Sequence, residues 1–148
     1  MTIIEGAAAG VIKDIRGANS VADQVEDFAA RKPLLDLSVT DPAPGVCVVG
    51  VGGELDMLTA PMLTGCLDEQ LANAPSHLVI DMQAVRFLGC SGLNTLVTVR
   101  ERALTMGVVL HLAGVEQRAV VLPLQATGLL PMFATYPTLD HALSTLAS

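Results

Sequence analysis

The sequence predicts an α/β domain built on a mixed, mostly parallel sheet. From residue 34 onward, short aliphatic runs alternate with stretches whose apolar residues recur at helical spacing. The order strand, strand, helix, strand, helix, strand, helix, strand, helix brings parallel strands together through right-handed crossovers. The 148 residues are 51% hydrophobic and 16% charged, which is enough apolar material for one aliphatic core.

The first four predicted strands are apolar runs bounded by turn residues. LLDLSVT (34–40) and GVCVVGVGG (45–53) form a pair joined by a turn over 41–45 that contains two prolines and a glycine. HLVIDM (77–82) and VVLHLAG (108–114) show no polar alternation, which is typical of strands buried on both faces.

The first two predicted helices have clear boundaries. Pro61 suits the first turn of a helix, and Gly107 suits the position just after a helix end. Each helix carries one apolar stripe toward the sheet. The stripes consist of Leu63, Cys66, Leu67 and Leu71 in the first helix, and of Leu93, Leu96, Val97 and Leu104 in the second.

The C-terminal part predicts two more helices around an edge strand. Residues 116–122 have a helical pattern that Pro123 is expected to end or kink. MFATYP (132–137) predicts the last strand, and residues 138–146 predict a closing helix with Thr138 as its N-cap.

Residues 1–33 differ in composition from the rest and predict an N-terminal extension that is partly helical. Ser20 is a suitable N-cap, Asp23 follows in the first turn, and Pro33 closes the segment. One face of this stretch is apolar, and it consists of Val21, Val25, Phe28 and Ala29.

Composition excludes several functions. The net charge of −7 argues against nucleic-acid binding, because phosphates require clustered Lys and Arg. No apolar run approaches the ~18 residues of a membrane span, and the start lacks a signal-peptide pattern. Cys47, Cys66 and Cys90 show no C-x-x-C spacing, which suits a reducing compartment. We expect a cytoplasmic protein that is a monomer or a weak dimer.

The usual enzyme motifs are incomplete. The glycines at 50–53 do not continue into the G-x-G-x-x-G pattern of dinucleotide sites, since Leu55 occupies the last position. A hydrolase nucleophile elbow at Ser91 would need a glycine at position 93, which Leu93 occupies. The three histidines have no metal-ligand spacing. We therefore expect no enzyme activity, no metal and no cofactor.

Functional positions in such sheets collect beyond the carboxyl ends of the parallel strands. Residues 53–56 and 87–91 both fall at such ends, so we expect them side by side. Ser91 stands between Cys90 and Gly92 where strand pattern changes to helix pattern. Its hydroxyl is open to two interpretations: a simple helix N-cap, or an exposed phosphoacceptor whose product anion the helix start tolerates.

An ordered set of motifs resembles the STAS domain, and more narrowly the bacterial anti-sigma-factor antagonists. The resemblance covers residues 34–147 and leaves out residues 1–33. It rests on GELD (53–56), TAP (59–61), LVIDM (78–82), RFLGCSGL (86–93), LHLAG (110–114), ATGL (126–129) and YPTLDHAL (136–143).

The resemblance implies a STAS fold over residues 34–148, with about five strands and helices mainly on one face. It implies binding to an anti-sigma factor, a serine kinase of the histidine-kinase-like fold, so that a sigma factor is released. The kinase would switch the protein off by phosphorylating Ser91, and a phosphatase would restore it. The implied partner-binding residues are Asp56, Gly89, Cys90, Gly92, Leu93 and Asn94.

Two residues depart from the D-S-[ST]-G-[LVI] motif of that family. Gly89 replaces the aspartate, and Cys90 replaces the first serine. Loss of the acid changes what a kinase meets beside Ser91, and Cys90 places a thiol there. A STAS module without phosphorylation therefore stays as the alternative, either as a constitutive antagonist or as a small-ligand or redox sensor.

Overall fold

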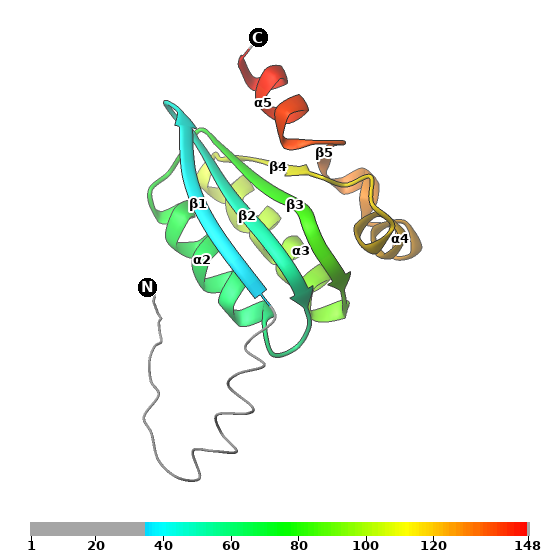
Figure 1. The fold of residues 1–148 in the computed structure, drawn as a ribbon. Coiled ribbons are helices and arrows are strands. Elements are labelled where there is room, and N and C mark those ends of the chain that lie inside the picture. Colours follow the sequence, from blue (N-terminus) through cyan, green and yellow to red (C-terminus); the bar gives the residue numbers. More distant parts are fainter. Residues whose placement is uncertain (1–34, 148) are drawn as a thin grey trace, which may run out of the picture. The chain divides into compact units, whose positions relative to one another are not determined.

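The computed structural model describes residues 35–147, which contain a five-stranded sheet (Figure 1). The strands lie across the sheet in sequence order. The first two are antiparallel, and each later pair of neighbours is parallel. The predicted mixed, mostly parallel sheet is confirmed. Its strands are β1 (Leu35–Ala43), β2 (Val46–Leu55), β3 (His77–Leu88), β4 (Val109–Ala113) and β5 (Ala134–Tyr136).

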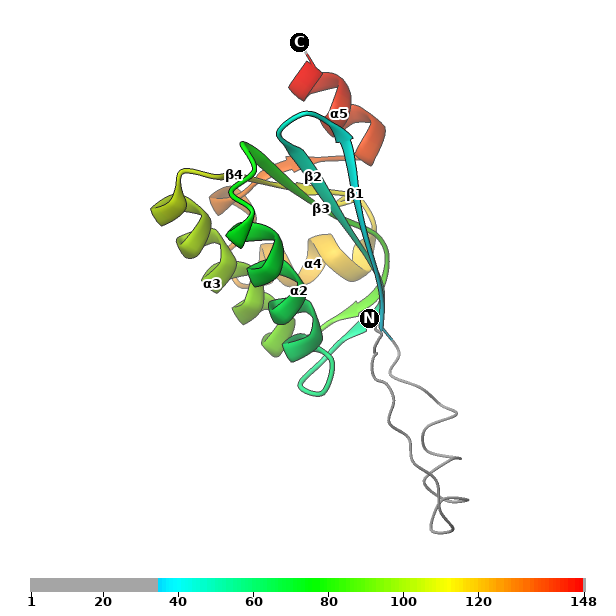
Figure 2. The same cartoon turned by 90° about the vertical axis from the view of Figure 1, so that its left-hand side faces the viewer.

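The helices cover the two faces of the sheet unequally. One face packs against the first three helices around a core of leucine and valine side chains, while the last helix covers a smaller cluster on the opposite face. Figure 2 shows α2 and α3 side by side on one face. Helices mainly on one face were expected, and this is confirmed. The helices are α2 (Ala60–Ala72), α3 (Cys90–Met106), α4 (Arg118–Ala126) and α5 (Leu139–Ala147), with a short 3-10 helix η1 (Leu130–Met132).

The turn between β1 and β2 is tighter than predicted. The strands continue to Ala43 and resume at Val46, so only two residues connect them. Gly45 has φ +77°, which is the left-handed region that a glycine enters without strain. The pairing is irregular between Thr40 and Ala43, where Pro42 has no N–H to donate.

β3 runs well beyond the predicted end at residue 82, to Leu88. Its pairing with β2 is irregular in the middle, where Gly50 faces Asp81 and Gly52 faces Ala84. The bulged carbonyls gain a partner from far along the chain, because Gln117 Nε2 donates to the carbonyl oxygens of Met82 at 2.6 Å and Gln83 at 2.8 Å. The polar, broken pattern after Met82 hid this second half of the strand.

Two helix predictions need correction. Leu104 was expected on the buried stripe of α3 but is 64% exposed, whereas Val99 and Ala103 are buried. The helix predicted over residues 116–122, which Pro123 was expected to end or kink, begins at Arg118 and does not end at the proline: it continues to Ala126, and Leu124 beyond the proline is fully buried.

The closing helix begins as predicted, since the backbone N–H of His141 donates to Thr138 Oγ1 at 3.1 Å. Gly107 also has the expected left-handed conformation after α3, with φ +73°. The helix predicted within residues 20–33 lies outside the described residues. None of the described helices is long and apolar enough to cross a membrane.

Candidate functional site

The carboxyl ends of β2 and β3 lie next to each other, as expected. Glu54 pairs with Phe87, and Leu55 pairs with Leu88. The contact continues past the strands, because the backbone N–H of Gly89 donates to the Leu55 carbonyl at 2.9 Å. The loop that leads into α2 and the start of α3 therefore leave the sheet together.

Asp56 shapes the loop after β2. Its Oδ1 accepts hydrogen bonds from the backbone N–H groups of Leu58 at 2.9 Å and Thr59 at 3.0 Å. The Thr59 hydroxyl donates to the Glu54 carbonyl at 2.7 Å and closes the turn. The pKa of Asp56 is lowered, chiefly by the Thr59 N–H, so this carboxylate stays ionised and tied to its own loop.

The start of α3 corrects one interpretation of Ser91. The N-cap is Gly89, whose carbonyl accepts the first helical bond from the Leu93 N–H at 3.0 Å. Ser91 is therefore the second helical residue and does not cap the helix. It is half-buried, and its neighbour Cys90 is exposed. The Ser91 hydroxyl therefore does not have the capping role that composition alone had favoured.

Gly92 and Leu93, predicted to contact a partner, lie in the interior. A Cβ at Gly92 would stand 2.8 Å from Leu88 Cδ1 and 2.9 Å from Leu55 Cβ, so the glycine permits close packing of α3 on the sheet. Leu93 is only 7% exposed and belongs to the main core. These residues are not part of the exposed surface, whereas Asn94 is exposed beside it.

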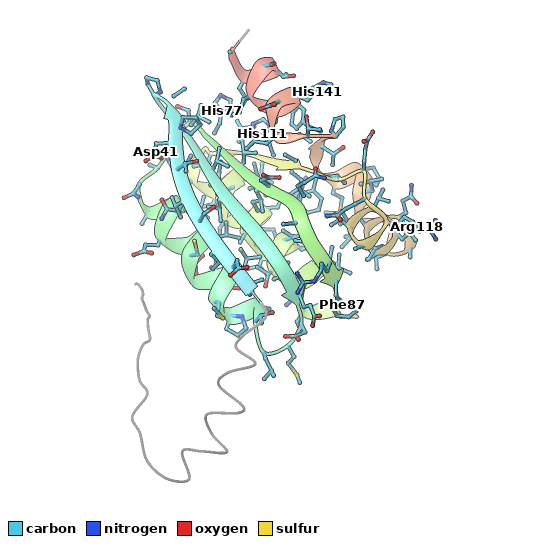
Figure 3. The ribbon with its side chains drawn as sticks, viewed as in Figure 1. Asp41, His77, Phe87, His111, Arg118 and His141 are labelled. Atoms are coloured by element: carbon cyan, nitrogen blue, oxygen red, sulfur yellow. The ribbon has the colours of Figure 1, made fainter. Side chains whose placement is uncertain are left out.

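Four apolar residues at this edge were missed by the sequence reasoning. Met57 is 76% exposed, Leu58 is 81%, Phe87 is 51% and Met62 is 41%. They come from the β2–α2 loop, the end of β3 and the first turn of α2, and Figure 3 labels Phe87 at the lower end of the sheet. We call these four the apolar patch. A Met-Leu pair in a loop just before a proline-started helix was the signal that could have pointed to it.

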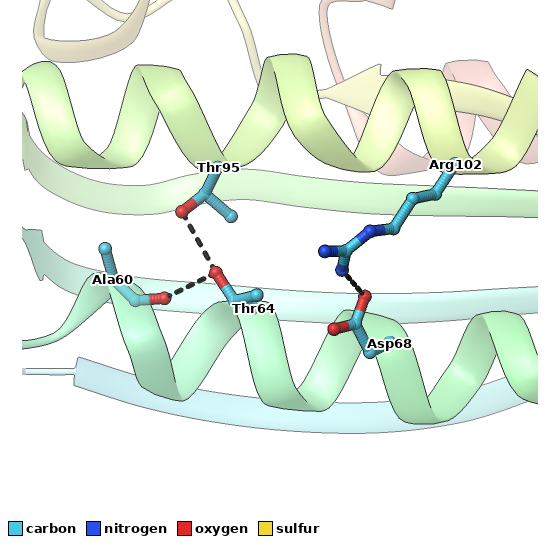
Figure 4. A network of polar contacts seen from close by, with 5 residues as sticks. All are labelled: Ala60, Thr64, Asp68, Thr95 and Arg102. Carbon is cyan, nitrogen blue, oxygen red and sulfur yellow. Dashed lines mark hydrogen bonds and ion pairs between the residues drawn. The ribbon is translucent and has the colours of Figure 1, made fainter.

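Two polar contacts join α2 to α3 behind this edge (Figure 4). Thr64 Oγ1 lies 3.0 Å from the Ala60 carbonyl and 3.1 Å from Thr95 Oγ1. Because Thr64 has a single hydroxyl hydrogen and the carbonyl can only accept, Thr95 donates to Thr64. Arg102 and Asp68 form an ion pair farther along both helices. These contacts therefore hold α2, which follows the loop of Asp56, against α3, which contains Ser91.

Other reactive groups lie away from this edge or are unreactive. Burial raises the pKa of the Cys66 thiol to about 11 and also raises that of Cys47. His111 is buried at the other end of the sheet, 3.1 Å from both His77 Nδ1 and the Tyr136 hydroxyl. In the described part of the chain, no group of three or more His, Cys, Asp or Glu residues could hold a metal ion.

The sheet order, its single antiparallel pair and the joined ends of β2 and β3 define a STAS-type α/β domain. Residues 39–142 match the family model described as the STAS domain. The chain belongs to this family.

Named relatives support the assignment. The chain is 38% identical over 103 residues to the anti-sigma-F factor antagonist RsfB of Mycobacterium tuberculosis, covering 68% of this chain and 80% of that protein. It is similar, at 38% identity and a TM-score of 0.67, to the crystal structure of an anti-sigma factor antagonist from Mycobacterium paratuberculosis, covering 77% of this chain and 95% of that one. The phosphorylated form of the Bacillus protein SpoIIAA shares the fold alone, at 13% identity and a TM-score of 0.61, covering 75% of this chain and 99% of that one.

Proposed function

We propose that this protein binds an anti-sigma factor and thereby releases a sigma factor. The observation that carries the proposal is the exposure of four apolar side chains around the carboxyl ends of β2 and β3, where α3 and Ser91 begin, in a chain that is 38% identical to an anti-sigma-F factor antagonist. Exposed methionine, leucine and phenylalanine side chains at one edge are typical of a protein-binding surface. The binding surface consists of the patch together with Asp56, Gly89, Cys90, Ser91 and Asn94.

Ser91 is the proposed switch of this surface. Its half-buried hydroxyl is at the second position of α3, between the exposed Cys90 and the buried Gly92. Phosphorylation adds about −1.5 to −2 charges. A misplaced charge across an interface costs several kcal/mol, and about 1.4 kcal/mol is tenfold in affinity. Modification of this one hydroxyl would therefore weaken binding at least tenfold, without refolding of the domain.

The partner would itself be the kinase, and a phosphatase would reverse the reaction. The resemblance to the antagonist family supports this assignment, and SpoIIAA, which shares the fold, has been obtained in a phosphorylated form. The protein is then a regulatory binding module and not an enzyme. Gly89 and Cys90 favour one alternative, a STAS module that antagonises constitutively or senses a small ligand or redox change.

Two assays test the proposal. Purified anti-sigma–sigma complexes are mixed with the protein, and displacement of the sigma factor is followed by gel filtration. The same anti-sigma factors are then incubated with labelled ATP and with the wild type, Ser91→Ala or Ser76→Ala. Ser76 is an exposed serine in the turn before β3 and serves as the control.

We expect sigma release by the unmodified protein, and labelling of the wild type and Ser76→Ala only. Equal labelling of Ser91→Ala, or labelling of no variant by any kinase, would eliminate the switch. Absence of sigma release with every complex would eliminate the proposed function itself.

A further inference from the structure

The Phe87 ring lies against the bare backbone of Gly89. A Cβ at Gly89 would stand 3.0 Å from Phe87 Cε2 and 3.3 Å from Cζ. Gly89 has φ −93° and ψ −176°, a backbone conformation open to any residue. The glycine is therefore not needed for the turn. The absence of a side chain at Gly89 instead leaves room for the Phe87 ring.

Glu54, the residue of β2 that pairs with Phe87, is half-buried, and the start of α3 adds no acid near Ser91. The first turn of α3 contains no acidic residue, and its N-cap has no side chain. Asp56, the acid of the neighbouring loop, is turned into that loop by its hydrogen bonds. The ring remains 51% exposed at the point where β3 leads into α3, so its outer face is available to a partner.

We propose that Phe87, positioned on Gly89, is a specificity-determining residue of the partner surface. This inference rests on the proposed function and adds the chemistry of recognition. The cognate anti-sigma factor presents an apolar side chain to the ring. An antagonist with an acid at position 89 would instead require a basic side chain on its partner. Aromatic side chains are frequent hot spots of interfaces, and their contacts are weakly affected by salt.

A double-mutant cycle tests the coupling between the two residues. Phe87→Ala, Gly89→Ala and the double variant are titrated with the anti-sigma factor that releases its sigma factor to the wild type. We expect each single variant to bind at least tenfold more weakly. The double variant should bind no more weakly than Phe87→Ala, because a methyl group at position 89 acts only by displacing the ring. Independent, multiplying losses, or unchanged binding by Gly89→Ala, would overturn the inference.

A partner-free measurement separates this inference from the proposed function. In NMR spectra, the ring current of Phe87 should displace the Gly89 Hα signals from their random-coil positions, and Phe87→Leu should abolish this displacement. Without that shift the position of the ring is wrong, even if the anti-sigma factor binds. With the shift but no binding to any anti-sigma factor, the proposed function fails and the specificity role fails with it.

Gly89→Asp distinguishes recognition from folding. Aspartate is a better N-cap than glycine, so this variant should be as stable as the wild type or slightly more stable. Its binding should nevertheless fall at least tenfold and become sensitive to salt. Loss of stability in parallel with binding, or wild-type affinity, would contradict the proposal.

Discussion

Close packing of α3 on the sheet at Gly92 makes the position of Ser91 sensitive to a single methyl group. Gly92→Ala would place its Cβ 2.8 Å from Leu88 Cδ1 and 2.9 Å from Leu55 Cβ. Leu55 Cβ is fixed close to the backbone of β2, so it cannot turn away as a side-chain end can. The helix start, including Ser91, must therefore shift away from the sheet.

The magnitude follows from comparison with a second helical glycine. Gly65, within α2, has nothing within 4 Å of an added Cβ. Gly65→Ala should therefore stabilise the protein by roughly 1 kcal/mol, the difference in helix propensity. Both substitutions change the unfolded chain equally. The difference between the two variants thus isolates the packing term at Gly92, which for overpacking is about 1–3 kcal/mol.

Urea unfolding followed by circular dichroism measures this difference. With a denaturant slope of about 2 kcal/mol per molar urea, the two midpoints should lie roughly 1 M apart, with Gly92→Ala the less stable variant. If Gly92→Ala is as stable as Gly65→Ala, α3 has room at its start. The close approach would then not position Ser91.

Two further predictions concern buried polar groups. Thr95→Val removes the donor to Thr64 and should lower the free energy of unfolding by about 0.5–1.5 kcal/mol. Thr95→Ser keeps the hydroxyl and serves as the control. Equal urea midpoints for the two variants would show that the Thr95–Thr64 hydrogen bond contributes nothing to stability. The pKa of His111 is lowered, first by burial and then by His77, so the unfolded chain binds the proton more readily than the folded one. Stability should therefore be constant above pH ~7 and fall as the pH drops below about 6.5, the ordinary value for histidine. Thermal unfolding from pH 8 to 5 should show a weaker pH dependence in His111→Gln, and an unchanged slope would rule out this origin.

Much of the fold could be predicted because it depends on local patterns. Thr138 as a cap, Gly107 after α3 and the apolar runs of β3 and β4 are visible in short windows of sequence. The second half of β3 is not, since Gln117 supplies its missing hydrogen bonds from 34 to 35 residues away. Leu104 was misplaced because alternative apolar stripes exist on α3, and only packing selects the one with Val99 and Ala103.

The location of the candidate site could be predicted from the sequence, but the side chains exposed on its surface could not. The joined ends of β2 and β3 follow from strand order alone, which brought Asp56 and Ser91 to one edge. Exposure of Met57 and Leu58 depends on the turn that Asp56 closes, and no pattern of hydrophobicity indicates it. Gly92 was expected to contact a partner, but the space beside it is filled from within by Leu55 of β2 and Leu88 of β3, which precede the helix and belong to other elements.

The central claim is that an anti-sigma factor binds the surface around Ser91 and that charge on this residue prevents it. Isothermal titration of the partner into the wild type, Ser91→Ala and Ser91→Glu tests this most directly. We predict equal affinities for the wild type and Ser91→Ala, and binding at least tenfold weaker for Ser91→Glu. Equal affinity for all three proteins would contradict the account.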